Sequence, residues 1–349
     1  MKKRIFALLL ALCMVFALAA CGTDTPEGPA ETGAETTPEA TPAAPADVPD
    51  VEASASLEFG TGSSTGTYYG FGSTFATYIS NNTGVNITAV TSDGSQANIE
   101  MVDGDEQQLG FVQSDVMDYA YNGTRLFVDA SGNPAPLTGF STLAALYMEQ
   151  VQIVTLDPEI KTVADLEGKY VSIGARGSGV YFNAIDVLGA YGLTEEDVNP
   201  VYQDFDNSVE SLQDGKIDAA FIVAGAPTTS IVQLATSNDV YLVSLDQEHI
   251  DALIESSPYY SAYTISKDVY GTDEDCTTVA ISAVLIGADD LDPDVAYTIV
   301  YTLFQNADKI SHAKAAEMSV EFGASITSVP YNEGAARFFS EQGFEVPAA

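Results

Sequence analysis

Glycines, hydroxyl-bearing side chains and side-chain amides gather in five short segments of this sequence, at 60–69, 92–95, 113–115, 174–180 and 224–228. Each segment lies between a strand-like apolar run and a helix-like run, so backbone N–H groups and the positive end of a helix dipole point to one place. Such a set suits a carboxylate or another small anion. The residues that we expect to contact this ligand are Thr61, Ser64, Thr65, Tyr68, Ser92, Gln113, Asp115, Arg176, Gly177, Ser178, Gly179, Val180, Gly225 and Pro227.

Three of these side chains have alternative interpretations. Arg176 is the one cation in the five segments, and it either holds a carboxylate with two hydrogen bonds or is an ordinary solvated arginine. Gln113 is able to bind an amide, an ammonium or a hydroxyl group, whereas Asp115 either holds an amino group or caps its helix. Tyr68 and Tyr69 either line a pocket or pack inside the protein.

The segment Gly62–Gly66 also matches the Gly-x-Ser-x-Gly pattern of a hydrolase, with Ser64 as nucleophile. A catalytic triad also needs a histidine, and His249 and His312 both lie in helix-like stretches where a surface position is expected. Neither glycine segment continues as Gly-Lys-Ser/Thr, which disfavours a nucleotide site. We therefore expect a binding protein rather than an enzyme, with a serine hydrolase as the alternative.

The composition excludes several other classes of protein. The chain has 349 residues with 12 Lys and Arg against 50 Asp and Glu, a formal net charge of −38, which repels nucleic acid. The three cysteines, Cys13, Cys21 and Cys276, have no metal-site spacing. We expect no metal, no cofactor and no nucleic-acid partner.

The N-terminus has the pattern of an export signal. A basic head precedes an apolar run that is too short for a permanent membrane anchor, and small residues precede Cys21 as in the lipobox of bacterial lipoproteins. The sequence predicts a signal peptide at 1–20 and lipidation of Cys21. Residues 21–56, rich in Pro, Thr, Ala and Glu, are predicted to form a disordered tether.

Strand and helix patterns alternate through the rest of the chain, which predicts an α/β fold with mixed, mostly parallel sheets flanked by helices. The 293 residues from 57 to 349 exceed one compact core, so two lobes are expected. We predict that the chain crosses between them at 148–156 and again at 276–283. Lobe I is then 57–150 plus 276–349, and lobe II is 151–275, with the ligand in the cleft between them.

Several ordered motifs resemble the TAXI family, the extracytoplasmic solute-binding subunits of TRAP transporters. The resemblance implies a two-lobed type II binding-protein fold, a ligand such as glutamate, glutamine or a related small carboxylate, and delivery to a membrane permease. With Cys21 it implies a monomeric, lipid-anchored receptor outside the cytoplasm of a Gram-positive cell. Ser63 and Thr65 stand where the family usually has glycine, and Arg176 replaces a usual proline. The resembling motifs are Gly60–Tyr69, Leu109–Asp115, Leu143–Tyr147, Val163–Gly174, Gly177–Gly179, Asp214–Phe221, Ala224–Pro227 and Asn332–Arg337.

Overall fold

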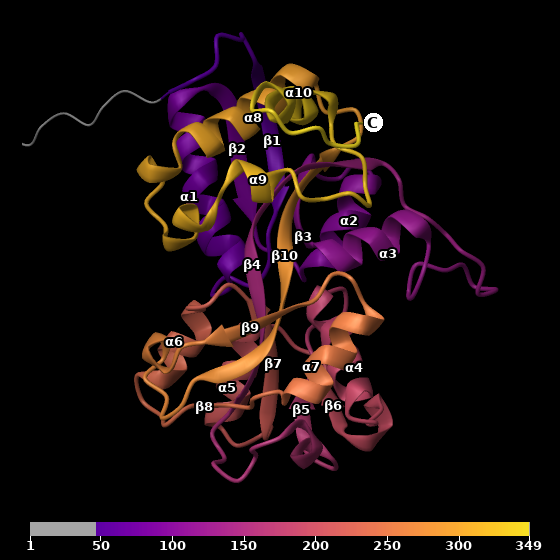
Figure 1. Cartoon of the computed structure of the whole chain (residues 1–349), viewed down its shortest axis with the longest axis vertical. Helices are drawn as coiled ribbons and strands as arrows, with labels where there is room; N and C mark the ends of the chain where they lie inside the picture. Colours follow the sequence, from indigo (N-terminus) through magenta and orange to yellow (C-terminus); the bar gives the residue numbers. More distant parts are fainter. Residues whose placement is uncertain (1–46, 349) are drawn as a thin grey trace, which may run out of the picture. The chain divides into compact units, whose positions relative to one another are not determined.

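The strands of the computed structural model, which describes residues 47–348, form one mixed sheet (Figure 1). Its order is β2-β1-β3-β10-β4-β7-β5-β6, with β8 beside β4 and β9 beside β10. The pairs that β1 makes with β2 and β3, and that β5 makes with β6 and β7, are parallel. The strands are β1 (Ser54–Gly60), β2 (Gly84–Val90), β3 (Leu109–Gln113), β4 (Phe140–Thr155), β5 (Tyr170–Ser172), β6 (Asn199–Val201), β7 (Ala219–Ala224), β8 (Tyr241–Leu242), β9 (Ser261–Ile265) and β10 (Cys276–Ala288).

Helices connect the parallel strands, because parallel neighbours need a long crossover connection. Their apolar faces cover the sheet, and short 3₁₀ turns complete several loops. The α-helices are α1 (Thr67–Asn82), α2 (Ser95–Asp103), α3 (Ser114–Asn122), α4 (Gly179–Ala190), α5 (Phe205–Gln213), α6 (Thr229–Ala235), α7 (Gln247–Ser256), α8 (Pro293–Gln305), α9 (Val320–Gly323) and α10 (Glu333–Glu341).

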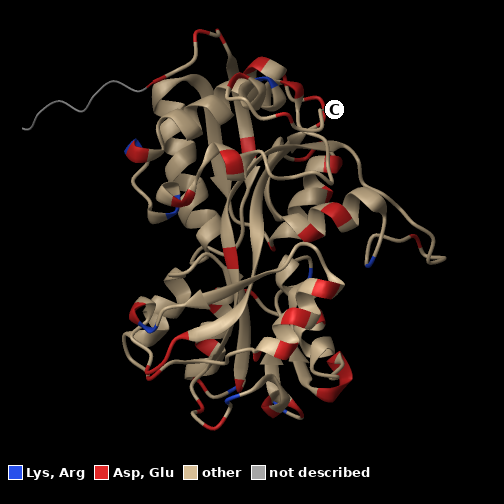
Figure 2. Ribbon diagram, in the orientation of Figure 1, with Lys and Arg blue, Asp and Glu red and all other residues tan. Residues whose placement is uncertain are grey.

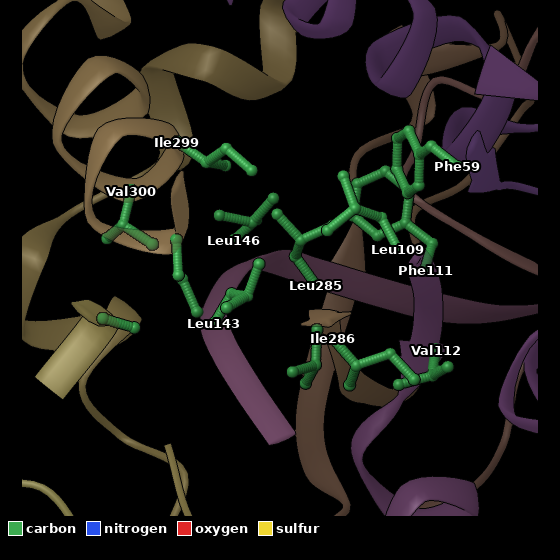
Figure 3. Close-up of a cluster of buried hydrophobic side chains, with 14 of the residues drawn as sticks. Phe59, Leu109, Phe111, Val112, Leu143, Leu146, Leu285, Ile286, Ile299 and Val300 are labelled. Carbon is green, nitrogen blue, oxygen red and sulfur yellow. The ribbon is translucent and has the colours of Figure 1, made fainter. Parts of the chain in front are cut away.

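The buried side chains divide the fold into two lobes. In the first lobe, β1–β3 and helices α1–α3, α8 and α10 surround one core, where Phe59, Phe111 and Leu285 point toward one another (Figure 3). In the second lobe, two smaller clusters pack around β7. The expected two-lobed α/β fold is confirmed.

Strands β4 and β10 are the connections between the lobes. They pair antiparallel, with Glu149 opposite Ile281, and the register shifts just beyond, between Ala283 and Val284. Tyr147 belongs to the first core, whereas Val151 belongs to the second. The segments of β4 and β10 that connect the two cores therefore lie side by side (Figure 1).

The structure differs from the expectation at two places. Strand β1 starts at Ser54, so residues 54–56 pair with β2 although the sequence assigned them to the tether. The side chains alternate in direction here, so Ala55, together with Ala53 just before the strand, packs against the first core. Strand β9, which the sequence pattern did not predict, pairs with the start of β10. The predicted signal peptide and Cys21 lie outside the described residues.

Candidate ligand-binding site

A cavity of about 50 Å³ lies at the junction of the two lobes. The first lobe contributes residues of the loops before α1, α2 and α3, and the second lobe contributes residues of the loops before α4 and α5. These loops follow the carboxyl ends of parallel strands, where ligands of open α/β sheets bind. By volume, the cavity in this arrangement has room for a few waters or a very small solute.

Five α-helices begin at this cavity. Their N-cap residues, which all line it, are Gly66 of α1, Gly94 of α2, Gln113 of α3, Ser178 of α4 and Asp204 of α5. The caps of α1, α2 and α3 make no side-chain capping hydrogen bond. The first N–H groups of a helix lack intrahelical partners and carry a partial positive charge, so the cavity is suited to a negative group.

Glu149 of β4 lies at the cavity and is 1% exposed. The hydroxyl of Tyr68 donates a hydrogen bond to its Oε2 at 2.8 Å. Burial raises the pKa of Glu149 to about 8, and the hydrogen bond from Tyr68 opposes this shift only in part. The carboxyl group is therefore mostly protonated at pH 7.

Two side-chain amides at the cavity have buried polar atoms without a hydrogen-bond partner in the described part of the chain. These atoms are Oε1 of Gln113, from the first lobe, and Nε2 of Gln203, from the second. An unpaired buried polar group costs about 1 to 3 kcal/mol. A ligand that accepts from Gln203 and donates to Gln113 would remove both costs.

The lobes are joined around the cavity by several hydrogen bonds. The hydroxyl of Thr67 donates to the carbonyl of Gly225 at 2.8 Å, and the N–H of Ala97 donates to the carbonyl of Gly177 at 3.0 Å. Lys314, which is 2% exposed, donates to the carbonyl of Ala226 at 2.8 Å. The cavity is thus enclosed by contacts that span both lobes.

Of the residues expected to contact the ligand, six line this cavity. They lie at the starts of α1, α2, α3 and α4, as their positions after the strands indicated. These residues are Tyr68, Ser92, Gln113, Ser178, Gly179 and Val180.

Thr61, Asp115, Gly177, Gly225 and Pro227 do not line the cavity. The hydroxyl of Thr61 donates to the carbonyl of Val90 at 2.5 Å. Asp115 is buried below the cavity and accepts from the Asn183 amide at 3.1 Å, and burial raises its pKa to about 7. Gly177 and Gly225 supply carbonyls to the contacts between lobes described above.

Ser64 and Thr65 also lie outside the cavity, where they contact the second lobe. Together with Ser63 they donate three hydrogen bonds to the carboxylate of Asp206 in α5, over 3.0 Å from Ser63, 2.9 Å from Ser64 and 2.5 Å from Thr65. We call these four residues the Asp206 clasp. Ser63 itself lines the cavity, so the clasp closes one of its walls.

The alternative of a serine hydrolase gains no support from this geometry. Ser64 donates to Asp206, an acceptor that is not a general base of a triad. His249 stacks on Tyr191 and faces Asp246, and His312 accepts from the backbone of Lys314. In the described residues neither histidine is hydrogen-bonded to Ser64.

Arg176 is exposed, and its guanidinium lies over the ring of Tyr202, 3.8 Å from the ring centre. It does not line the cavity, whose walls contain no Lys or Arg among the described residues. Arg176 cannot hold a ligand there in this arrangement. Figure 2 shows Asp and Glu spread over both lobes and few Lys and Arg, so the positive partial charges at the cavity are those of the helix starts.

Glu149, Asp204, Phe205 and Gln203 line the cavity but did not stand out in the sequence. Glu149 follows an apolar run within β4, where a single carboxyl in the middle of a buried strand was an available signal. The described residues contain no group of three or more His, Cys, Asp or Glu arranged to hold a metal ion. Among the same residues, no helix is both long and apolar enough to span a membrane.

Two α/β lobes, joined by two strands, thus surround one cavity. The chain belongs to the NMT1-like family, whose model matches residues 59–343. The expected resemblance is thereby confirmed at the level of this family, and the narrower TAXI assignment stays a prediction.

Several solved structures are similar to this chain at low sequence identity. The alkanesulfonate-binding protein SsuA from Xanthomonas axonopodis, bound to MOPS, is 15% identical over 82% of this chain and 84% of its own, with a TM-score of 0.46. An arginine-specific periplasmic binding protein from Salmonella typhimurium is 14% identical over 75% and 96%, with a TM-score of 0.43. A protein from Bordetella bronchiseptica RB50 is 17% identical over 76% of each chain, with a TM-score of 0.49.

Proposed function

We propose that this chain is a solute-binding receptor whose lobes close on a small carboxylate. The observation that carries the proposal is the convergence of five helix starts on one cavity between the lobes. Backbone N–H groups at helix starts bind anions without a cationic side chain. The unpaired amide nitrogen of Gln203 adds a further donor from the second lobe.

The chemistry of the cavity favours a small anionic ligand such as glutamate, a related amino acid or an organic acid. A neutral sugar would leave the helix starts without an anionic partner. A large ligand would need the lobes to separate, because the enclosed volume is about 50 Å³.

We assign the lobes as 57–150 plus 276–349 and 151–275, with β4 and β10 as the hinge. One detail modifies this division, because Val279 and Ile281 at the start of β10 pack in the second core. Two adjacent strands that bend together permit a hinge motion, and a ligand that contacts both lobes favours the closed form. Solution scattering with and without ligand tests this, since closure reduces the radius of gyration.

The partner in this proposal is the membrane permease of a TRAP transporter, as the TAXI-like motifs imply. The predicted lipidation of Cys21 would hold a monomeric receptor at the outer side of the membrane. Replacing Cys21 with serine tests this anchor. That change should release the protein from cells. A Cys21→Ser protein that stays membrane-bound contradicts the anchor but leaves the binding function intact.

The experiment that tests the function is a calorimetric screen of the purified chain against amino acids, 2-oxo acids, dicarboxylates and neutral sugars. We expect saturable binding of a small carboxylate in the micromolar range or tighter. Tight binding of a sugar and of no carboxylate would refute the proposal. Ester hydrolysis that disappears in Ser64→Ala would favour the hydrolase instead.

A further inference from the structure

The cavity contains hydrogen-bond acceptors as well as donors. The carboxyl group of Glu149 and the unpaired Oε1 of Gln113 both belong to the first lobe. The unpaired Nε2 of Gln203 and the starts of α4 and α5 belong to the second. A ligand that fits both walls has a proton-donating group close to its carboxylate.

The surroundings of Glu149 decide which kind of donor fits. Tyr68 is the hydrogen-bond donor to this carboxyl group in the described part of the chain, and it contacts Oε2. Among charged and titratable neighbours, Tyr147 on the same strand and Asp115 of α3 do not neutralise a negative Glu149. Among the described residues, Lys314 is the cation that lowers the pKa of Glu149, and its ammonium group already pairs with Glu317 at 2.6 Å and with the carbonyl of Ala226.

A buried carboxyl without a cation of its own stays protonated at neutral pH, and an adjacent cation ionises it. A ligand ammonium group would be that cation. Its charge would pair with ionised Glu149, and its remaining hydrogens would be available to Gln113. A 2-oxo group has no hydrogen to donate, so Gln113 would stay unpaired and Glu149 would keep its proton.

We infer that Glu149, together with Gln113, selects ligands that carry an ammonium group next to the carboxylate. This inference rests on the proposed function, because it concerns the same cavity. When an ammonium ligand binds, the O–H bond of Glu149 breaks and its proton passes to the solvent, and no other covalent bond changes.

The test compares matched ligands, L-glutamate with 2-oxoglutarate and L-alanine with pyruvate, on the wild-type full-length chain and on Glu149→Gln. Calorimetry in two buffers of different ionisation enthalpy gives the affinity and the protons exchanged. At pH 7 we expect binding of the amino ligand to release about one proton more than binding of the 2-oxo ligand, because only the ammonium group ionises Glu149. This difference in proton release does not depend on how far Glu149 is protonated in the free protein, since both titrations start from the same free protein.

In Glu149→Gln the difference in protons should vanish, and the affinity for the amino ligand should fall at least thirtyfold, while the affinity for the 2-oxo ligand changes less than threefold. Glu58→Gln makes the same substitution at an exposed position of β1 and is the matched control. Far-ultraviolet circular dichroism checks that each variant is folded. If Glu149→Gln does not fold, the difference in proton release measured on the wild type decides by itself whether Glu149 has this role.

The outcomes separate the two proposals. If the wild type binds both ligands of a pair with equal proton exchange, or prefers the 2-oxo ligand, the role of Glu149 is refuted and the receptor function stands. If no small carboxylate binds at all, the proposed function fails and this inference fails with it.

Discussion

The Asp206 clasp should hold the lobes together around a bound ligand, and Asp206→Ala removes it. Three hydroxyl groups of the first lobe donate to one carboxylate of the second, at 2.5 to 3.0 Å. A hydrogen bond to a charged group contributes about 1.5 to 3 kcal/mol when buried, but Ser64 is exposed and Asp206 is half-exposed. After a discount for solvent, we expect the clasp to contribute about 2 kcal/mol to the closed form.

Because the clasp forms only when the lobes meet, its loss should weaken ligand affinity about thirtyfold. The effect should fall on the dissociation rate, measured by stopped-flow displacement, and leave the association rate nearly unchanged. Asp206 also lies in the first turn of α5, where an acidic side chain stabilises the helix, but that contribution is the same in open and closed forms.

Asp214→Ala is the matched control for this variant. Asp214 lies at the other end of α5, is exposed and pairs with Lys216 at 2.7 Å, so its removal should change the dissociation rate less than twofold. A dissociation rate of Asp206→Ala within twofold of the wild type would refute the clasp. An equal acceleration by Asp214→Ala would show that the effect is only a loss of charge.

Two further predictions concern other groups at the lobe boundary. In Gly179→Ala the new Cβ would lie 2.1 Å from Oε1 of Gln113, so closure should be obstructed and ligand affinity should fall at least tenfold. Gly189→Ala in the same helix is the control, because its Cβ meets no atom within 4 Å and the variant should bind normally. Equal affinities of the two variants would contradict the close approach of Gly179 to Gln113. Burial raises the pKa of Glu149 to about 8 and of Asp115 to about 7, so the folded protein binds more protons than the unfolded chain, and the free energy of unfolding should fall as pH rises from about 4 to 8. Urea titrations should show a loss of up to about 4 kcal/mol from Glu149 that Glu149→Gln abolishes, and an unchanged slope in that variant would refute it.

The elements of the site were predictable because their signals are local. The loops before α1 and α4 are glycine-rich, and periodic apolar residues such as Phe71 and Phe75 follow the first of them. Ser178 caps its own helix, accepting from the N–H of Tyr181, so sequence spacing alone located that turn correctly. For such residues the backbone conformation and the site are set by the same few neighbours.

The direction in which a side chain points was harder to predict. Arg176 lies in the expected loop, yet its guanidinium stacks on Tyr202, which enters from a segment 26 residues later in the chain. Glu149 shows the converse, since its burial depends on how β4 passes between two cores. Both outcomes follow from long-range packing, which no short pattern encodes.

The convergence of five helix starts also affects the energy of closure. Each start carries roughly half a positive charge, and closing the lobes brings those of α4 and α5 toward those of α1, α2 and α3 in a space that excludes water. Like partial charges repel more strongly as water leaves, and an anion between them turns this repulsion into attraction. On the proposed function, closure would therefore depend on what is enclosed, and the closed shape would report whether a ligand is bound.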